Sequence, residues 1–315
     1  MKPVLYLVVP CYNEQAVLPA SIKIFLHKMS QLVANNIVSE ESRLMFVDDG
    51  SRDNTYNIIC DTAKEDGRVC AVKLSRNCGH QKALLAGLME AKDKCDIAIS
   101  LDCDGQDDVN AIDSMIKCYF DGCDIVYAVR RNRESDSAFK RTSAQLFYKF
   151  LKIMGAETVY NHADYRLLSK KAIEALSRYK EVNLYLRGMV SLVGFKSTCV
   201  YYDRLPRVSG ESKYPPGKMI SLALEGITSF TVKPIRIITT VGFLIAIISF
   251  IGIVWSVIAR LIGNTVSGWA STVAIICFLG GIQILSIGVI GEYIGKIYIE
   301  TKHRPRYIID EKINM

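Results

Sequence analysis

Residues 4–14 read VLYLVVPCYNE, an apolar run that stops at a proline and continues into polar and acidic side chains. A run of roughly four to eight apolar residues bounded by turn-forming residues is typical of a buried β-strand. Similar runs follow at residues 44–48, 69–74, 97–101 and 124–129. Helical periodicity lies between them, and strands that alternate with helices build parallel βαβ units. The pattern therefore predicts an α/β fold with a Rossmann-like, mostly parallel sheet covered by helices.

The chain has 315 residues, of which 50% are hydrophobic and 23% are charged. This composition excludes a disordered or fibrous protein, and the length allows about two domains. The ten cysteines form no CxxC pair and no zinc-type Cys/His cluster, so reduced, buried thiols are expected. The net charge is +7, but the basic residues form no continuous stripe, so nucleic acid is not an expected partner.

Two segments near the C-terminus carry no charge, residues 237–259 and 269–291. Each reaches ~34 Å as a helix, enough to cross a hydrocarbon layer about 30 Å thick. Because the connector 260–268 holds a single charge, Arg260, the pair is expected to form a transmembrane hairpin. Basic residues flank it at Lys233, Arg236, Lys296, Lys302, Arg304 and Arg306. Basic flanks stay cytoplasmic, which predicts a multi-pass protein of the inner (cytoplasmic) membrane with both termini in the cytosol.

These segments divide the chain into four parts. Residues 1–215 are expected to form a cytosolic domain, and residues 216–234 an amphipathic interfacial helix that lies against membrane lipid. Residues 235–292 are the expected hairpin, and residues 293–315 a cytosolic basic tail.

Acidic residues follow three of the predicted strands, in YNE (12–14), VDDGS (47–51) and SLDCDGQDD (100–108). The carboxyl ends of parallel strands meet at one edge of a sheet, where ligands bind. Asp102 and Asp104 are expected on the same side of an extended turn, with Gln106 beyond them. Oxygen ligands at this density suit Mg²⁺ or Mn²⁺. No P-loop and no GxGxxG motif is present, which argues against standard NTPases and dinucleotide-binding proteins.

Basic residues follow the same strand ends and are candidates to hold an anionic ligand. They are Arg76, Lys82, Arg130, Arg131, Arg133, Lys140, Arg141, Arg166, Arg187, Arg207 and Lys213. A solvated surface explains scattered cations equally well, but clustering after strand ends favours contacts with phosphate.

The order of the motifs along the chain resembles a known family. The resemblance is carried by VVPCYNE, VDDGS, SRNCGHQKALLAG (75–87), LDCDGQDD, ADYRLLSKKAIEAL (163–176), LRGMVSLVGF (186–195), RVSGESKYPPGKMISLALEGITSF (207–230) and GEYIGKIYIETKHRPRY (291–307). Over nearly its whole length the chain resembles family 2 glycosyltransferases of the GT-A fold. Within that family it is most similar to the polyprenyl-phosphate glycosyltransferases, which include dolichol-phosphate mannose synthases and bactoprenol glucosyltransferases. Position 103 is Cys where the family often has Ala, and its side chain is expected to turn away from the metal.

The resemblance implies roles for individual residues. The residues expected in the nucleotide-sugar pocket are Pro10, Tyr12, Glu14, Asp48, Asp49 and Asp102, with Arg207 and Lys213 near the diphosphate. The expected ligands of a divalent metal are Asp102, Asp104 and Gln106. The residues expected to meet the lipid phosphate are Arg130, Arg131, Lys140 and Arg141. The expected catalytic residues are Asp104 and Asp164, the latter at the family's base position.

The resemblance also implies a reaction. A hexose, most often glucose, passes with inversion from a UDP-sugar to undecaprenyl or another polyprenyl phosphate at the cytoplasmic membrane face, giving a sugar donor for cell-envelope glycans. The same reaction with N-acetylglucosamine or another sugar stays open, as do a homo-oligomer and a non-catalytic, membrane-tethered nucleotide-sugar-binding protein. A processive polysaccharide synthase is disfavoured because the QxxRW motif is absent.

The chemistry of such an acceptor limits what Asp164 has to do. A phosphomonoester has a second pKa near ~6 and is already an anion at neutral pH. We therefore expect Asp164 to position the sugar or neighbouring arginines rather than to remove a proton.

Overall fold

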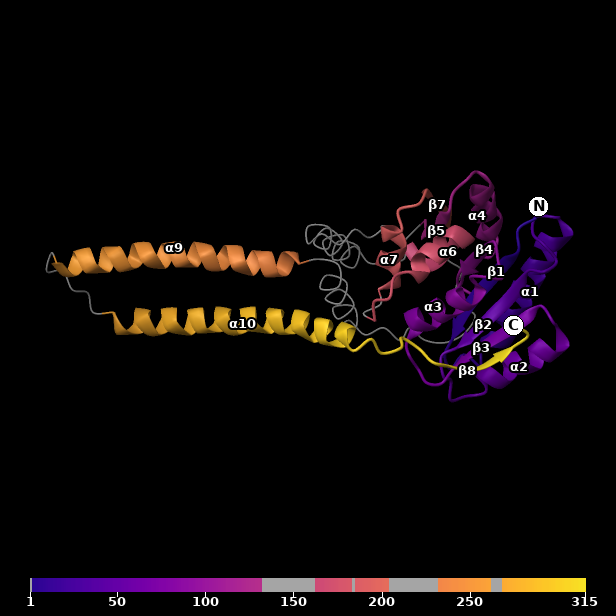
Figure 1. Cartoon of the computed structure of the whole chain (residues 1–315), viewed down its shortest axis with the longest axis horizontal. Helices are drawn as coiled ribbons and strands as arrows, with labels where there is room; N and C mark the ends of the chain where they lie inside the picture. The colour runs from indigo at the N-terminus through magenta and orange to yellow at the C-terminus, as the bar shows by residue number, and fades with distance from the viewer. Residues whose placement is uncertain (1, 132–161, 183–184, 204–231, 262–267) are drawn as a thin grey trace.

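The computed structural model describes residues 2–131, 162–182, 185–203, 232–261 and 268–315. They form one eight-stranded sheet with helices on both faces, and a long helical hairpin extends away from it (Figure 1). The strands are β1 (Leu5–Cys11), β2 (Arg43–Asp48), β3 (Val69–Leu74), β4 (Ile97–Ser100), β5 (Ile125–Arg130), β6 (His162–Ser169), β7 (Ser197–Tyr202) and β8 (Ile309–Ile313). The helices are α1 (Leu18–Ala34), α2 (Thr55–Glu65), α3 (His80–Ala91), α4 (Ala111–Phe120), α6 (Lys170–Ser177), α7 (Leu186–Leu192), α9 (Lys233–Leu261) and α10 (Trp269–Thr301).

The strand order in the sheet is β7-β5-β6-β4-β1-β2-β3-β8. β1 pairs in parallel with β2 and β4, β2 with β3, and β5 with β7. β6 runs antiparallel between β4 and β5, and β8 runs antiparallel along β3. The prediction of an α/β fold with a mostly parallel sheet is confirmed, and the ends of β1, β2 and β4 lie side by side at one edge.

Buried side chains fill both faces of this sheet. Phe25 and Phe46 belong to the cluster under α1, α2 and α4, and Leu85 and Met189 to the cluster under α3, α6 and α7. The side chains of α1 that recur at helical spacing are all buried, namely Leu18, Ile22, Phe25, Met29 and Leu32. Successive strand residues point to opposite faces, so strands covered on both sides are apolar throughout. This is why the five apolar runs of the sequence correspond to β1 to β5.

Three strands, β6, β7 and β8, correspond to none of the five apolar runs. β7 has a single buried residue, Tyr202. β6 contains Asp164 and Arg166, which interrupt its apolar pattern although both are buried. β8 lies in residues 293–315, where the sequence suggests a basic tail; instead α10 continues to Thr301 and Ile309–Ile313 forms an edge strand. Its three central residues are charged and exposed, as is usual for an edge strand.

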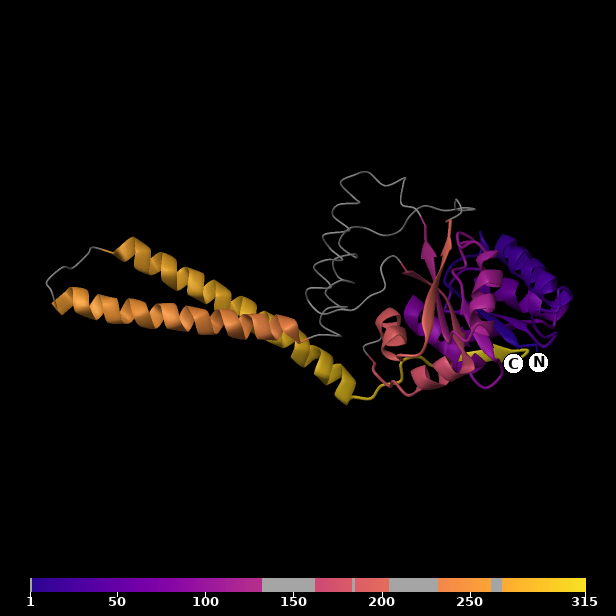
Figure 2. The ribbon, with the colours of Figure 1, turned by 90° about the horizontal axis from the view of Figure 1, so that it is seen from above.

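The hairpin consists of α9 and α10, which project together from the sheet domain (Figure 2). Both are long and apolar enough to cross a membrane: Lys233–Gly252 has a mean hydropathy of 2.2, and Phe278–Thr301 has one of 1.4. None of the residues in these two windows is buried within the chain. Most of the expected interfacial helix, residues 216–234, lies outside the described residues.

Gly87 allows α3 to approach the sheet closely. A Cβ atom at this position would overlap Val8 and lie 2.7 Å from Cγ2 of Val47, and both valines are buried and stiff at χ1. We expect Gly87→Ala to lower the free energy of unfolding by about 1–3 kcal/mol through overpacking. Thermal unfolding of the detergent-solubilised full chain measures this. Gly67→Ala is the control, because a Cβ there meets nothing within 4 Å; equal melting temperatures for the two variants would contradict the prediction.

Candidate active site

The sheet topology brings four polar segments to one edge. Cys11 at the end of β1 pairs with Asp48 at the end of β2, and β4, beside β1, leads directly into Asp102. On the other side of β4, Ser100 pairs with Arg166 of β6, and its hydroxyl donates a hydrogen bond to the carbonyl of Asp164. Asp164 therefore reaches the same edge as Asp102, although it arrives on an antiparallel strand.

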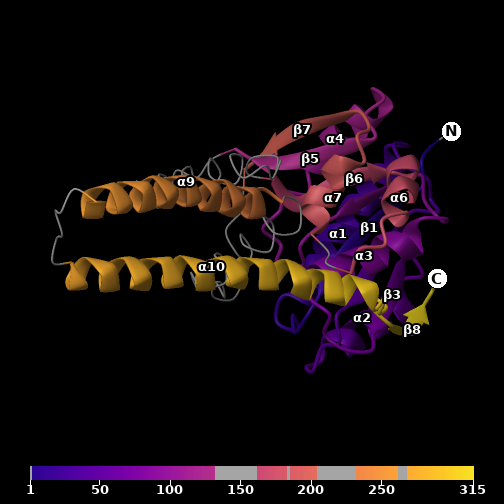
Figure 3. The ribbon, with the colours of Figure 1, turned by 60° about the vertical axis from the view of Figure 1, so that its left-hand side comes forward.

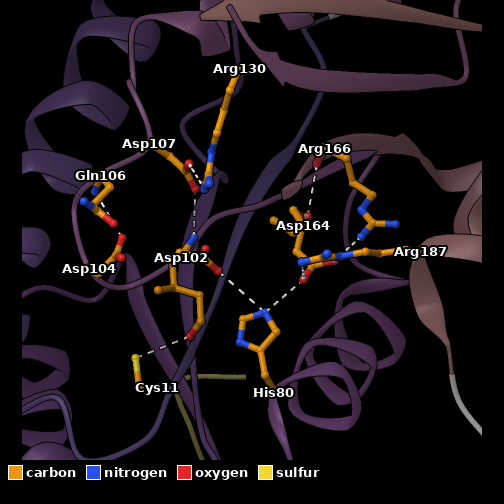
Figure 4. A network of polar contacts seen from close by, with 12 residues as sticks. Cys11, His80, Asp102, Asp104, Gln106, Asp107, Arg130, Asp164, Arg166 and Arg187 are labelled. Atoms are coloured by element: carbon orange, nitrogen blue, oxygen red, sulfur yellow. Dashed lines mark hydrogen bonds and ion pairs between the residues drawn. The ribbon is translucent and has the colours of Figure 1, made fainter. Parts of the chain in front are cut away.

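His80 lies between Asp102 and Asp164 (Figure 4). Its Nε2 atom is 3.6 Å from Oδ1 of Asp102 and 3.5 Å from Oδ2 of Asp164. Burial disfavours a charged imidazole, but the hydrogen bond with Asp164 and the charge of Asp102 raise the pKa of His80 above its ordinary value. His80 is the first residue of α3 and follows Gly79, which has φ 93°. The His80 side chain is 41% exposed. His80 is not among the site residues that the sequence predicts, because a histidine outside a recognisable cluster carries no signal for this role.

Asp164 is the most strongly compensated carboxylate of the site. Its side chain is 6% exposed and accepts hydrogen bonds from Arg166 and from both Nε and Nη2 of Arg187, at 3.1 and 2.9 Å. Burial alone would raise the pKa of Asp164, but the hydrogen bond with His80 and the charges of Arg187 and Arg166 hold it well below its usual range. Arg166 is 1% exposed, so the prediction that it faces a phosphate is wrong: it neutralises Asp164 instead.

Asp102 has a different environment. Burial raises its pKa to about 6; His80 opposes this shift, while Asp107, Asp164 and Asp104 add to it. Asp107 is buried and accepts a hydrogen bond from the Tyr202 hydroxyl at 2.6 Å. Among the described residues, the site thus concentrates carboxylates around Asp102.

Arg130 contributes one of those cations. Its Nη2 lies 3.7 Å from Asp107 and its Nε donates to the Tyr202 hydroxyl at 3.1 Å. Arg131 follows it at the end of β5 and is exposed. Five further candidates for contacts with phosphate lie outside the described residues, namely Arg133, Lys140, Arg141, Arg207 and Lys213.

The candidate metal ligands fit an ion shared with a substrate. Asp102, Asp104 and Gln106 offer oxygen donors, and Asp104 Oδ1 accepts a hydrogen bond from the Gln106 backbone at 3.1 Å (Figure 4). Within the described part of the chain, no three His, Cys, Asp or Glu side chains converge to form a complete metal cage. Mg²⁺ is usually held by one or two carboxylates plus substrate phosphates, which matches this donor set and the carboxylates around Asp102. Cys103 is 5% exposed and belongs to the hydrophobic core, as expected.

Asp48 and Asp49, at the end of β2, differ in how many of their carboxylate oxygens accept hydrogen bonds. Both oxygens of Asp49 are used, because they accept hydrogen bonds from the backbone of Cys78 at 2.7 Å and of Gly79 at 2.9 Å. Asp48 accepts from the Ser51 backbone through Oδ2, whereas its Oδ1 is buried and has no hydrogen-bond partner among the described residues. Burial raises the pKa of both carboxyls. Asp49 thus fixes the loop that leads to His80, and Asp48 keeps one free acceptor.

The three remaining candidates lie around the end of β1. Pro10 is buried within the strand, and Tyr12 is 40% exposed. The backbone N–H of Glu14 donates to Thr55 at 2.9 Å, which fastens this loop to α2. These residues border the same edge as Asp48.

Comparison with known proteins agrees with this fold. Residues 6–177 match the model of glycosyl transferase family 2, and residues 233–297 match that of the GtrB C-terminal hairpin. The chain belongs to glycosyl transferase family 2. This family 2 chain is 47% identical over 309 residues to the uncharacterized glycosyltransferase YkoT of Bacillus subtilis, with 98% of this chain and 92% of YkoT covered.

A further relative is the bactoprenol glucosyl transferase of Shigella phage SfV. It is 41% identical over 305 residues, which cover 96% of this chain and 97% of the relative. Among solved structures, the glucosyl-3-phosphoglycerate synthase of Mycobacterium tuberculosis, in complex with Mn²⁺, UDP and phosphoglyceric acid, is similar at 16% identity and a TM-score of 0.47, covering 72% of this chain and 76% of the synthase.

Removing the charge of Asp164 leaves Arg166 buried without a counter-ion. We expect Asp164→Asn to lower the free energy of unfolding at pH 7 by about 3–5 kcal/mol. Because the folded pKa of Asp164 is depressed, its stabilising charge is present above the unfolded value of ~3.9 and is lost as the pH falls toward the folded pKa. The gap in melting temperature between wild type and variant should therefore narrow as the pH falls below about 4.

The control for this prediction is Asp61→Asn. Asp61 forms an exposed ion pair with Lys64 on α2, so its loss should hardly change the melting temperature at any pH. A gap for Asp164→Asn that is independent of pH would show that the charge is not what stabilises the fold.

Proposed function

We propose that this glycosyltransferase transfers a hexose, first of all glucose, from a UDP-sugar to undecaprenyl phosphate or another polyprenyl phosphate. The observation that carries the proposal is the edge of the sheet at which Asp102, Asp104 and the compensated Asp164 meet, in a chain that also contains an apolar hairpin. The relative named bactoprenol glucosyl transferase covers both parts of the chain, which supports a lipid acceptor.

The donor would lie across the ends of β1, β2 and β4. The free oxygen of Asp48 is a buried acceptor suited to an N–H or hydroxyl of the nucleoside, with Pro10, Tyr12 and Glu14 beside it. Mg²⁺ or Mn²⁺ would be held by Asp102, Asp104 and Gln106. When bound, such an ion supplies neutralisation of the charge that grows on the leaving diphosphate. Asp49 would act indirectly, because its carboxylate orders the loop before His80.

The reaction is a single displacement. An oxygen of the lipid phosphate attacks the anomeric carbon, the bond from that carbon to the diphosphate breaks, UDP leaves, and the configuration inverts. Arg130 and Arg131, at the end of β5, are placed to meet the phosphate of the acceptor. The hairpin holds the site at the cytoplasmic face, and this fixes in advance the orientation of an acceptor that cannot leave the bilayer.

Asp164 positions Arg187 in this scheme. A general base works best when its pKa lies near the operating pH, whereas that of Asp164 is held well below its usual range. Arg187 is 40% exposed and bound at two points by Asp164, so it can present its remaining N–H groups to a phosphate. The low pKa supports a carboxylate that fixes an arginine and needs no proton from the acceptor.

The proposed reaction is tested with the purified full chain in nanodiscs that contain undecaprenyl phosphate. Radiolabelled UDP-glucose with Mg²⁺ or Mn²⁺ should yield a labelled lipid, EDTA should abolish its formation, and added metal should restore it. We expect Asp102→Asn to slow transfer by about 100-fold or more, whereas Asp93→Asn, at an exposed turn, should leave it unchanged.

Other outcomes of this assay identify the alternatives. Faster transfer from UDP-N-acetylglucosamine would change the sugar but keep the reaction. Retained affinity for UDP-sugars without turnover would indicate a nucleotide-sugar-binding protein and would contradict the proposed activity.

The role of Asp164 is tested by the pH dependence of the rate. Asp164→Asn keeps the shape of the side chain but removes its basicity. If Asp164 positions Arg187, the variant should be slowed by less than about 10⁴-fold and should keep a limb near ~6, the second pKa of the acceptor phosphate. Loss of that limb together with a larger fall in rate would show that Asp164 removes a proton.

A further inference from the structure

The end of α10 reaches the sheet domain. This helix has 33 residues and is about 50 Å long, whereas roughly 20 residues suffice to cross the apolar layer. The uncharged stretch of this helix ends at Gly291, and the last turns carry Glu292, Lys296 and Glu300. The carboxylate of Glu300 accepts a hydrogen bond from the backbone N–H of Val182, at 2.9 Å. Val182 lies in the connection between α6 and α7.

That connection leads into the first turn of α7, which supplies Arg187 to the site. The backbone N–H of Leu186 donates to the side chain of Gln81 at 2.8 Å, and Arg187 makes its two hydrogen bonds to Asp164. Leu186 at the start of α7 is thus bonded to Gln81, next to His80, and Val182, which precedes α7 in the chain, is bonded to Glu300 near the end of α10. We expect a change at either contact to displace the backbone at the start of α7, which carries Arg187.

A second contact runs from the same helix end. After α10 the chain turns at His303, which has φ 47°, and the carbonyl of Ile308 accepts a hydrogen bond from the Ser75 backbone at 3.0 Å. β8 then continues along β3, where Lys73 lies 3.1 Å from Glu311. Figure 3 shows α10 leading into β8 beside β3. Ser75 begins the loop that ends at His80, so the segment that follows α10 is bonded to the loop that delivers His80 to Asp164.

We propose that Glu300 is a positioning residue of this enzyme: it fixes Val182 and thereby holds α7 so that Arg187 stays against Asp164. The active-site geometry then depends on the apolar helix to which the site is joined. This inference rests on the proposed function for its effect on rate, but the contact itself does not depend on the reaction. Small displacements of a contacting group reduce rates steeply, so the bond matters more for turnover than for overall stability.

The first experiment measures the transfer rate of three variants of the full chain in nanodiscs. We expect Glu300→Ala to lower kcat about tenfold with little change in melting temperature. Glu300→Gln keeps an oxygen that accepts from Val182 and should restore most of the rate. Glu292→Ala removes the same side chain from the exposed surface of the same helix and should leave the rate unchanged. A wild-type rate for Glu300→Ala, or a Glu300→Gln variant as slow as Glu300→Ala, would overturn the inference.

The second experiment does not depend on transfer. Hydrogen–deuterium exchange of residues 185–192 should rise in Glu300→Ala but stay at the wild-type level in Glu300→Gln and Glu292→Ala. Unchanged exchange in Glu300→Ala would show that α7 does not depend on this contact. If the wild type transfers no sugar at all, the proposed function fails, while the exchange measurement still decides whether Glu300 holds α7.

Discussion

A carboxylate that is removed from water must be surrounded by positive charge, and the arrangement of this site depends on how Asp164 meets that requirement. Removing an ion from water costs several kcal/mol even after relaxation. Three elements repay this cost together, because Arg166 comes from β6, Arg187 from α7 and His80 from α3. The same charges that compensate Asp164 therefore hold these three elements in fixed positions around the sheet edge.

Within the described part of the chain, the rest of the edge holds several carboxylates close together. Arg130 and Tyr202 contact Asp107, Asp102 lies near Asp104, Asp107 and Asp164 as well as His80, and burial raises the pKa of Asp102 to about 6. Such a set of oxygens suits a divalent cation and a diphosphate that arrive together. The site thus has a half in which arginines neutralise Asp164 and a half rich in carboxylates around Asp102, and the hydrogen bonds of Asp49 hold the loop that leads to His80.

The hairpin and the sheet domain are connected by hydrogen bonds, ion pairs and strand pairing of the C-terminal segment. α10 continues beyond its apolar part, ends at a hydrogen bond to the α6–α7 connection, and gives way to β8 on the sheet. An edge strand with charged side chains would be a weak element by itself, but Lys73, Tyr56 and Glu90 bind Glu311 and Lys312 across it. The C-terminal segment thus ties the hairpin to the sheet at the strand that leads toward His80.

The sequence by itself determined the elements whose signal is local. Apolar runs marked β1 to β5, uncharged stretches marked the hairpin, and residues after strand ends marked Asp48, Asp102 and Asp104, because burial and strand direction leave a trace in neighbouring residues. Only the tertiary structure decided the partners of Asp164, the burial of Arg166, the place of His80 and the pairing of β8. Most of those features depend on contacts between segments that are separate in the chain: Asp164 meets Arg187 of α7 and His80 of α3, and β8 pairs with β3. The sequence does not show whether a charged residue is buried until its partner is known.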